Sequence, residues 1–283
     1  MDRRSAFFRS SGPLSLVLVL ICLLALAGCP PVPKPDTRTD TDITRTTGPL
    51  DQVAGAKALK EAQNTFDEAS KQVKSGEKVP AEARAKYQQV VDIVEKRVLP
   101  QVSRDDLKVT AYALEAFSKW KLDDYIGAQN TAEKGKKLCG GAAANPRDCA
   151  MLQMVAGLVV ASQAYDKYKD APKMSLEEMK GFANRMEAAL QEINAVNRTS
   201  DPRDSITIYA NQWQLLIIRQ ATNFWYTYFR KEAAVWKPEV LKWLSRADQV
   251  GKKFPAPPYL NQERTLKLQE EFGRLKKKAE EPS

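Results

Sequence analysis

The side chains that could do chemistry in this chain are restricted, because it contains no histidine. Imidazole is the usual base of Ser-His and Cys-His nucleophile pairs and a common zinc ligand. Catalysis would therefore have to rest on carboxylates, Lys, Ser or Tyr. The acid pairs at 105–106, 123–124 and 177–178 all stand at predicted helix starts, where free backbone amides favour negative charge. We predict a capping role for these pairs, and no catalytic residue, metal site or cofactor.

The first 28 residues have the three parts of an export signal. Three arginines precede an apolar stretch of about 14 residues that begins at Leu14, and small residues follow it. This stretch is shorter than the roughly 20 residues that span a bilayer as a helix, and the prolines from Pro30 onwards cannot extend it. We predict that residues 1–28 are a removable signal; a short membrane anchor is the alternative.

The end of this signal, Leu26-Ala27-Gly28-Cys29, resembles the lipobox of bacterial lipoproteins. The resemblance implies cleavage before Cys29, a diacylglycerol on its sulfur and a fatty acid such as palmitate on its new amine. Several acyl chains on one residue hold a protein firmly on a membrane. Pro30 stands where, in enterobacteria, an Asp keeps such proteins in the inner membrane, so the resemblance favours the periplasmic face of the outer membrane. An ordinary secretory signal with a chance Cys is the alternative.

Two cysteines, Cys139 and Cys149, remain once Cys22 leaves with the signal and Cys29 is lipidated. We predict that they form a disulfide, because an exported protein meets an oxidising compartment. Closing the 11-residue loop would stabilise the fold by about 3 kcal/mol in the chain-entropy model. Free thiols, in a host without disulfide machinery, are the alternative.

The charge of the mature chain argues against a nucleic-acid partner. Residues 29–283 carry 41 Lys and Arg against 34 Asp and Glu, interleaved along the sequence. A nucleic-acid-binding protein would show a basic stripe on a recognisable motif, and export would separate it from that partner. Weak attraction to anionic lipid headgroups or cell-wall polymer is the expected effect.

The mature chain divides by composition into three parts. Residues 29–49 are rich in Pro and Thr and cannot bury a core; about 20 extended residues would form a tether reaching roughly 60 Å. Residues 50–258 have helical periodicity throughout. Residues 259–283 form a highly charged helix with the apolar stripe Leu268, Phe272 and Leu275, which is typical of a terminal cap.

Caps and prolines divide residues 50–283 into about nine helices, the charged C-terminal one included. Ser103 with Asp106 is predicted to cap one helix, and Ser175 with Glu178 forms a capping box for another. A helix over 202–231 is apolar nearly all round, which indicates burial between neighbours, and Pro238 is predicted to open the next. The sequence predicts an all-α fold of stacked antiparallel hairpins, either a tetratricopeptide-like α-solenoid or an irregular helical bundle.

The segment from Tyr112 to Gly135 resembles a tetratricopeptide repeat. Its small and aromatic positions match at Ala116, Tyr125, Ala128 and Ala132. The sequence departs from the pattern at Glu115 and Lys119, where the repeat has apolar or aromatic residues, and at Gly135, which replaces Ala. The predicted helix starts are not spaced by a steady 34 residues.

The candidate surface for a partner or ligand is an aromatic-rich stretch. Trp and Tyr are enriched at binding hot spots, although they also fill helical cores. The candidates are Tyr209, Trp213, Trp225, Tyr228, Trp236 and Trp243.

These observations lead to three functional hypotheses. The first is a lipid-anchored, non-catalytic scaffold or docking subunit for other envelope proteins, by analogy with helical lipoproteins. The second is a periplasmic binding protein for a small apolar or aromatic ligand, which would partner a transporter. The third is a carboxylate-dependent cell-wall enzyme.

Overall fold

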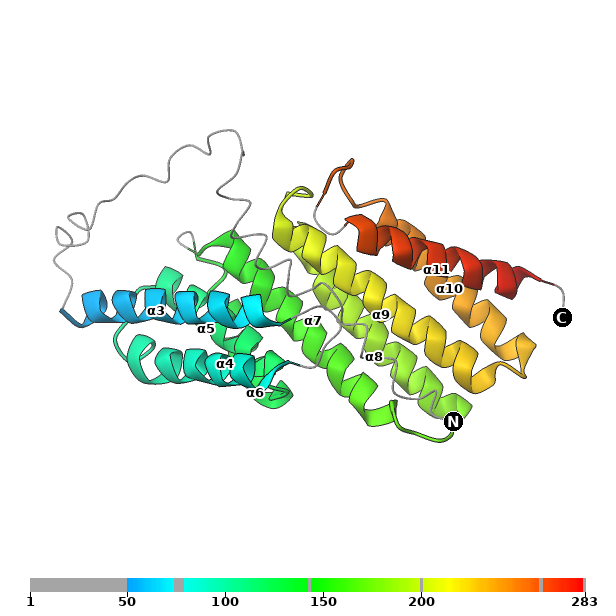
Figure 1. The fold of residues 1–283 in the computed structure, drawn as a ribbon, viewed down its shortest axis with the longest axis horizontal. Coiled ribbons are helices and arrows are strands. Elements are labelled where there is room, and N and C mark those ends of the chain that lie inside the picture. The colour runs from blue at the N-terminus through cyan, green and yellow to red at the C-terminus, as the bar shows by residue number, and fades with distance from the viewer. Residues whose placement is uncertain (1–49, 74–78, 142–143, 199–200, 260–261, 282–283) are drawn as a thin grey trace. The chain divides into compact units, whose positions relative to one another are not determined.

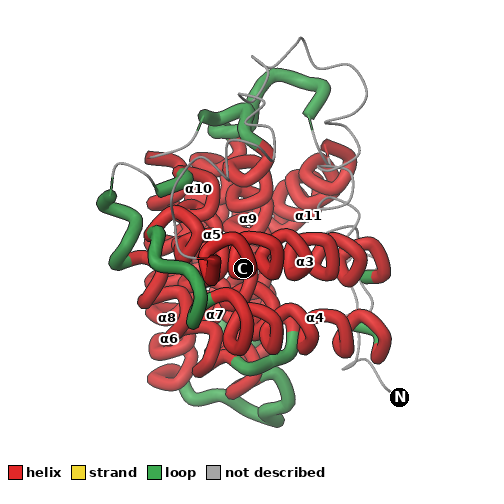
Figure 2. Tube along the Cα trace, turned by 90° about the vertical axis from the view of Figure 1, so that its left-hand side faces the viewer, coloured by secondary structure: helices red, strands yellow, loops and turns green. Residues whose placement is uncertain are grey.

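The computed structural model describes residues 50–73, 79–141, 144–198, 201–259 and 262–281. Every regular element in these ranges is helical and none is a strand (Figures 1 and 2). This confirms the all-α prediction. The export signal, Cys29 and the tether lie outside the described residues, so their interpretation stays a prediction.

The chain divides into two compact units, Met1–Asp148 and Cys149–Ser283. The first contains four α-helices in its described part: α3 (Leu50–Gln72), α4 (Ala81–Ile93), α5 (Asp105–Lys121) and α6 (Tyr125–Lys136). A π-helical turn, Val94–Val98, continues α4. Each helix packs against the next and α3 also packs against α5, which is the order expected for stacked hairpins.

Three aromatic rings from successive helices form the core of the first unit. The ring of Phe66 on α3 meets Tyr87 on α4 and Phe117 on α5 edge to face, with centroids 5.7 and 5.4 Å apart. All three are at most 2% exposed. Fully burying a side chain of this size contributes about 1.5–3 kcal/mol, so these rings hold the stack of hairpins together.

The α5–α6 hairpin uses small side chains where the two helices cross. Ala116, Ala128 and Ala132 are fully buried, as the repeat-like spacing indicates. Asp124 caps α6 by accepting a 2.9 Å hydrogen bond from the Gly127 amide. Asp124 therefore has the predicted capping role, whereas Asp123 pairs with Arg84 of α4 at 2.8 Å.

The second unit begins within α7 and packs five helices in chain order. They are α7 (Pro146–Tyr168), α8 (Leu176–Asn194), α9 (Ser205–Phe229), α10 (Ala233–Gly251) and α11 (Gln262–Glu280), with a short 3-10 turn over Ala195–Arg198. Helices α8 to α11 each contact the next, and α11 also contacts α9. Helix α11, which lies in the region predicted to form a C-terminal capping helix, packs against α10 and α9 of this unit.

Helices α7 and α8 approach closely at Gly157. A Cβ at this position would lie 2.5 Å from Ile193 Cγ1 and 2.7 Å from the Ala189 carbonyl oxygen. Only glycine leaves room for the two backbones at this distance.

Helix α9 is the central helix of the second unit. Its residues from Ile206 to Ile218 are all buried, because α8, α10 and α11 all pack against it. The prediction of a helix buried between its neighbours is confirmed. The buried amide of Gln214 donates a 2.9 Å hydrogen bond to Asn211 Oδ1, so the polar groups on this helix are partly matched to one another.

Two predicted helix starts are wrong. Ser103 does not cap α5: the N-cap is Arg104 without a side-chain cap bond, and Ser103 Oγ accepts a hydrogen bond from the Gln52 amide instead. Pro238 lies inside α10, which begins at Ala233. Burial of Trp236, only 4% exposed, stabilises a first turn ahead of the proline. The Ser175–Glu178 capping box is confirmed, with both of its hydrogen bonds formed.

The cysteines at 139 and 149 are disulfide-bonded, which confirms that prediction. The bond joins the turn after α6 to the first turn of α7.

Candidate functional site

The aromatic residues predicted to form a binding surface are largely core residues. Five of the six are at most 9% exposed: Tyr209, Trp213, Trp225, Trp236 and Trp243. The sixth, Tyr228, is half-buried, and its hydroxyl donates to the carbonyls of Tyr168 and Ala171 at 3.2 and 2.9 Å. These five rings are buried in the folded chain and offer little surface to a partner protein.

The physical reason is that neighbouring helices cover most of the aromatic rings of α9, although Tyr226 and Tyr228 stay partly exposed. Phe224 stacks on Phe182 of α8, with ring centroids 4.4 Å apart, and lies 5.7 Å from the ring of Tyr165 of α7. Trp236 of α10 meets Tyr226 edge to face at 5.1 Å. These rings fill the space between helices. This is the alternative noted in the sequence, that Trp and Tyr also fill helical cores.

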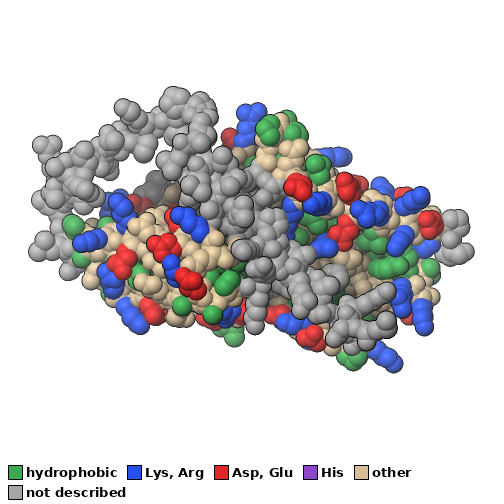
Figure 3. Space-filling view, in the orientation of Figure 1, with side chains coloured by type: hydrophobic (Ala, Val, Ile, Leu, Met, Phe, Trp, Pro, Cys, Tyr) green, Lys and Arg blue, Asp and Glu red, His purple; other side chains and the backbone are tan. Residues whose placement is uncertain are grey.

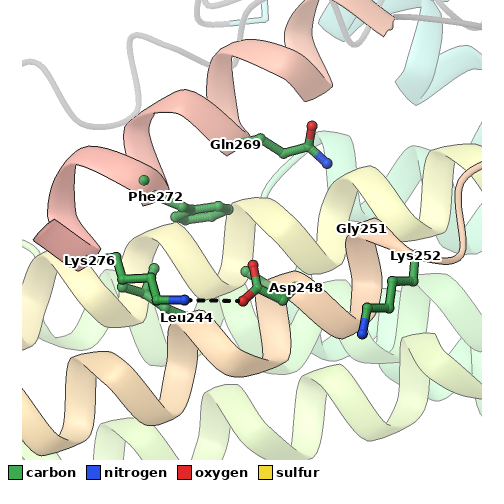
Figure 4. Close-up of a pocket in the computed structure, with 9 residues that line it drawn as sticks. Leu244, Asp248, Gly251, Lys252, Gln269, Phe272 and Lys276 are labelled. Atoms are coloured by element: carbon green, nitrogen blue, oxygen red, sulfur yellow. Dashed lines mark ion pairs between the residues drawn. The ribbon is translucent and has the colours of Figure 1, made fainter.

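A hollow of about 450 Å³ lies between α10 and α11, and we call it the α10/α11 groove (Figure 4). Its lining residues are Leu244, Ala247, Asp248, Gly251, Lys252, Gln269, Phe272, Gly273 and Lys276. None of them belongs to the predicted aromatic surface. The groove therefore depends on how two consecutive helices, α10 and α11, pack against each other.

The floor of the α10/α11 groove is apolar. Leu244, Ala247 and Phe272 are at most 6% exposed, and the Phe272 ring lies between the two helices (Figure 4). Gly273 also lines the groove, and a Cβ there would meet no atom within 4 Å. An apolar side chain entering the groove would leave water, at roughly 25 cal/mol for each Å² it buries.

The rim of the α10/α11 groove is polar and carries more positive than negative charge. Lys276 Nζ lies 3.8 Å from Asp248 Oδ2. Lys252, the exposed residue that ends α10, has no ion pair among the described residues. Gln269 adds an exposed amide. Such a rim over an apolar floor suits binding of a segment that has both apolar and anionic groups.

Helix α11 is held firmly enough against α9 to keep this groove formed. Glu271 pairs with Arg219 of α9, its Oε2 lying 2.8 Å from Nε, and Gln212 of α9 donates to Thr265 Oγ1 at 3.4 Å. Arg264 is 9% exposed, and burial lowers the pKa of its guanidinium to about 10. These contacts come from the side of α11 that faces α9, which leaves its other side to the groove.

A second polar cluster lies in the first unit, around Lys119. Its ammonium lies 2.6 Å from Glu115 and 2.7 Å from Glu95, and Thr131 donates a 2.9 Å hydrogen bond to Glu115. Burial alone would lower the pKa of Lys119, but its hydrogen bonds to Glu115 and Glu95 raise it. Glu115 is 3% exposed, so a polymer substrate could not reach it. The cluster explains the departure from the repeat pattern: an ion pair occupies the positions of two apolar side chains.

The remaining acid pairs also stand where the sequence places them. Asp105 and Asp106 lie in the first turn of α5, and Arg104 holds Asp106 through two hydrogen bonds of 3.1 and 2.6 Å. Burial works to raise the pKa of Asp106, but the hydrogen bonds and charge of Arg104, together with hydrogen bonds from backbone amides, lower the pKa overall. These carboxylates act at helix starts, as predicted.

The described surface on the face drawn in Figure 3 shows no separation of charge. In the view of Figure 3, acidic and basic side chains are interspersed over the described surface, in agreement with their interleaving in the sequence. Within the described ranges, no cluster of three or more potential metal-binding side chains occurs. Nor does any helix described here combine the length and apolarity needed to cross a membrane.

Comparison with known proteins gives no match: neither a protein family, nor a curated protein, nor a solved structure is significantly similar to this chain. The residues of the α10/α11 groove were not predicted from sequence. A glycine in the middle of a charged helix, Gly273, was the one local signal, because glycine destabilises a helix interior by roughly 0.5–1 kcal/mol relative to alanine.

Proposed function

We propose that this protein is a lipid-anchored, non-catalytic docking subunit of the cell envelope, which binds a segment of another envelope protein in the α10/α11 groove. The observation that carries the proposal is the groove itself. Its apolar floor and charged rim lie between two helices that the rest of the second unit holds in place. Grooves between helices with such walls are a common means of binding an amphipathic segment.

The proposed anchor rests on the sequence. Lipidation at Cys29 would fix the chain to a membrane, and the Pro- and Thr-rich residues that follow would give the folded units a reach of roughly 60 Å. A docking subunit on such a tether could search the periplasmic space near its membrane. The periplasmic face of the outer membrane is the location that Pro30 favours.

The competing function is binding of a small apolar or aromatic ligand. The volume of the groove, about 450 Å³, lies within the roughly 300–1,000 Å³ range of ligand pockets. Drug-sized ligands, however, are largely enclosed by their pockets, whereas Asp248, Lys252 and Gln269 at this rim are exposed. We therefore favour a protein segment as the occupant.

The anchor is tested by metabolic labelling with a traceable palmitate. The native chain should incorporate the label and sediment with membranes, and the Cys29→Ser variant should do neither. Equal labelling of both forms would contradict the anchor without bearing on the groove.

Docking is tested by photo-crosslinking in the native envelope. A crosslinking amino acid at Gln269, on the rim of the groove, should form adducts with a protein neighbour. The same amino acid at Asn184, an exposed residue of α8, is the matched control and should not yield that adduct. Recovery of a small molecule and no protein at Gln269 would favour the ligand-binding alternative.

A further inference from the structure

The chemistry of the α10/α11 groove also restricts the kind of segment that it can take. We propose that the occupant is an acidic amphipathic helix of the partner protein, with apolar side chains on Phe272 and carboxylates at Lys252 and Lys276. This inference rests on the docking function proposed above and specifies its partner.

The shape of the groove fits more than one apolar side chain. Leu244 and Ala247 stand one turn apart on α10, and Phe272 faces them from α11. A helical ligand presents apolar residues at i, i+3, i+4 and i+7 along one face. Such a face can place two neighbouring side chains on this floor.

The charge of the groove selects an acidic ligand. Asp248 is the single acid among the nine lining residues, against two lysines. The 3.8 Å separation of Lys276 and Asp248 is long beside the roughly 2.7–2.9 Å of a charge-assisted hydrogen bond, so Lys276 can turn to a better-placed carboxylate. Lys252 has no acidic partner among the described residues and is exposed.

The two lysines also set a spacing for the acids of the partner. Lys276 lies beside Asp248, and Lys252 follows Asp248 by four positions on α10, a rise of roughly 6 Å. Residues at i and i+4 of a partner helix are separated by the same rise. The geometry therefore fits two Asp or Glu residues one turn apart, beside an apolar stripe.

Two designed peptides provide the probe. Both are 18-residue helices, on the order of five turns, with Leu at i, i+3, i+4 and i+7 and a fluorophore at one end. One carries Glu at two flanking positions four residues apart, and the other carries Lys there. Binding to the mature chain, residues 29–283 with Cys29→Ser, is followed by fluorescence anisotropy.

The acidic peptide should bind at least about tenfold more tightly than the basic one. Lys252→Glu should weaken binding of the acidic peptide by about tenfold and strengthen binding of the basic one. Lys242→Glu makes the same charge change at an exposed site of α10 outside the groove and should alter both affinities by less than about threefold.

A steric block gives an independent readout. Gly273 lines the groove, and a Cβ there meets no atom within 4 Å, so Gly273→Trp adds a large ring at the groove and should abolish binding of the acidic peptide. Gly181→Trp is the matched control, because a Cβ at Gly181 of α8 also meets no atom within 4 Å. It should leave binding unchanged, and circular dichroism should show both variants folded.

Three results would overturn the acidic-helix inference: equal binding of the two peptides, binding of neither, or acidic-peptide binding that survives Gly273→Trp. The docking function is judged separately. A protein crosslinked at Gln269 in the envelope through a neutral or basic segment would retain docking and refute the acidic helix.

Discussion

Asp248 on α10 and Lys276 on α11 form an ion pair across the α10/α11 groove, with 3.8 Å between the carboxylate oxygen and the ammonium nitrogen. Both side chains are about half exposed or more, at 64% and 47%, so water screens the attraction. The pair therefore contributes little to folding. Its position at the rim gives it a larger effect on what the groove binds.

We predict that Asp248→Asn changes the free energy of unfolding by less than about 1 kcal/mol. The same change should strengthen binding of the acidic peptide, because it removes the acid that competes for Lys276. Urea unfolding and fluorescence anisotropy measure the two effects. A weaker affinity for the acidic peptide would show that Asp248 contacts the ligand favourably.

The Lys119–Glu115 ion pair in the first unit should contribute much more to the free energy of unfolding than the exposed Asp248–Lys276 pair, because Glu115 is buried. Lys119→Met leaves this carboxylate without its cation and should destabilise the fold by about 2–4 kcal/mol. The double variant Glu115→Gln/Lys119→Met should recover most of the loss, since a neutral amide still accepts the hydrogen bond from Thr131.

Lys96→Met is the control for this prediction. Lys96 pairs with Asp92 at 3.2 Å on an exposed face, and its loss should cost less than about 0.5 kcal/mol. Urea unfolding compares the three variants. Equal effects of Lys119→Met and Lys96→Met would mean that the buried contact between Lys119 and Glu115 contributes no more to stability than an exposed ion pair.

Replacing glycine by alanine should change stability in opposite directions at two helical positions of the second unit. Gly157→Ala would push a methyl group against Ile193 and the Ala189 carbonyl, and should destabilise by about 1–3 kcal/mol. Gly273→Ala adds a methyl group to open space and should stabilise by roughly 0.5–1 kcal/mol. Thermal unfolding of both variants checks the sign, and a stabilising Gly157→Ala would contradict the close approach of α7 and α8.

The buried Tyr87 should make stability fall in alkaline solution. Burial raises the pKa of its phenol from 10.0 to about 12, despite the hydrogen bond with Ser70. The stability that neutral Tyr87 contributes is complete below the unfolded value and is lost as the pH rises through the folded one. The resulting loss is on the order of 2–3 kcal/mol.

The measurement compares native protein and Tyr87→Phe by urea unfolding from about pH 9 to about pH 12. Lysines titrate in both proteins, so their contribution cancels in the difference. The variant should lose less stability over this window. Parallel curves would mean that Tyr87 ionises as readily in the folded state as in the unfolded state.

The sequence was most informative where a structure depends on neighbouring residues. Helical periodicity and local caps such as Ser175 and Asp124 predict most helices, because hydrogen bonds within a few residues determine them. The prediction that Pro238 begins a helix was wrong, because burial of Trp236 outweighs the local preference of proline for a first turn. Local rules do not include such distant packing.

The candidate site was harder to predict because it depends on tertiary contacts. An all-round apolar pattern indicates that α9 is buried but does not identify the helices that cover Trp213 and Trp225. Gly273 on α11 and Lys252 at the end of α10 both line the groove. They do so because the two helices pack together, and the local sequence does not encode how these helices pack. The cysteine pair was predictable because export implies an oxidising compartment.

The most direct test of the docking function combines the crosslinker at Gln269 with the steric block, in the native envelope. With Gly181→Trp, the protein adduct at Gln269 should form as in the unblocked chain, and with Gly273→Trp it should disappear while the amount of folded protein stays equal. An adduct that persists unchanged with Gly273→Trp would show that the partner does not occupy the α10/α11 groove.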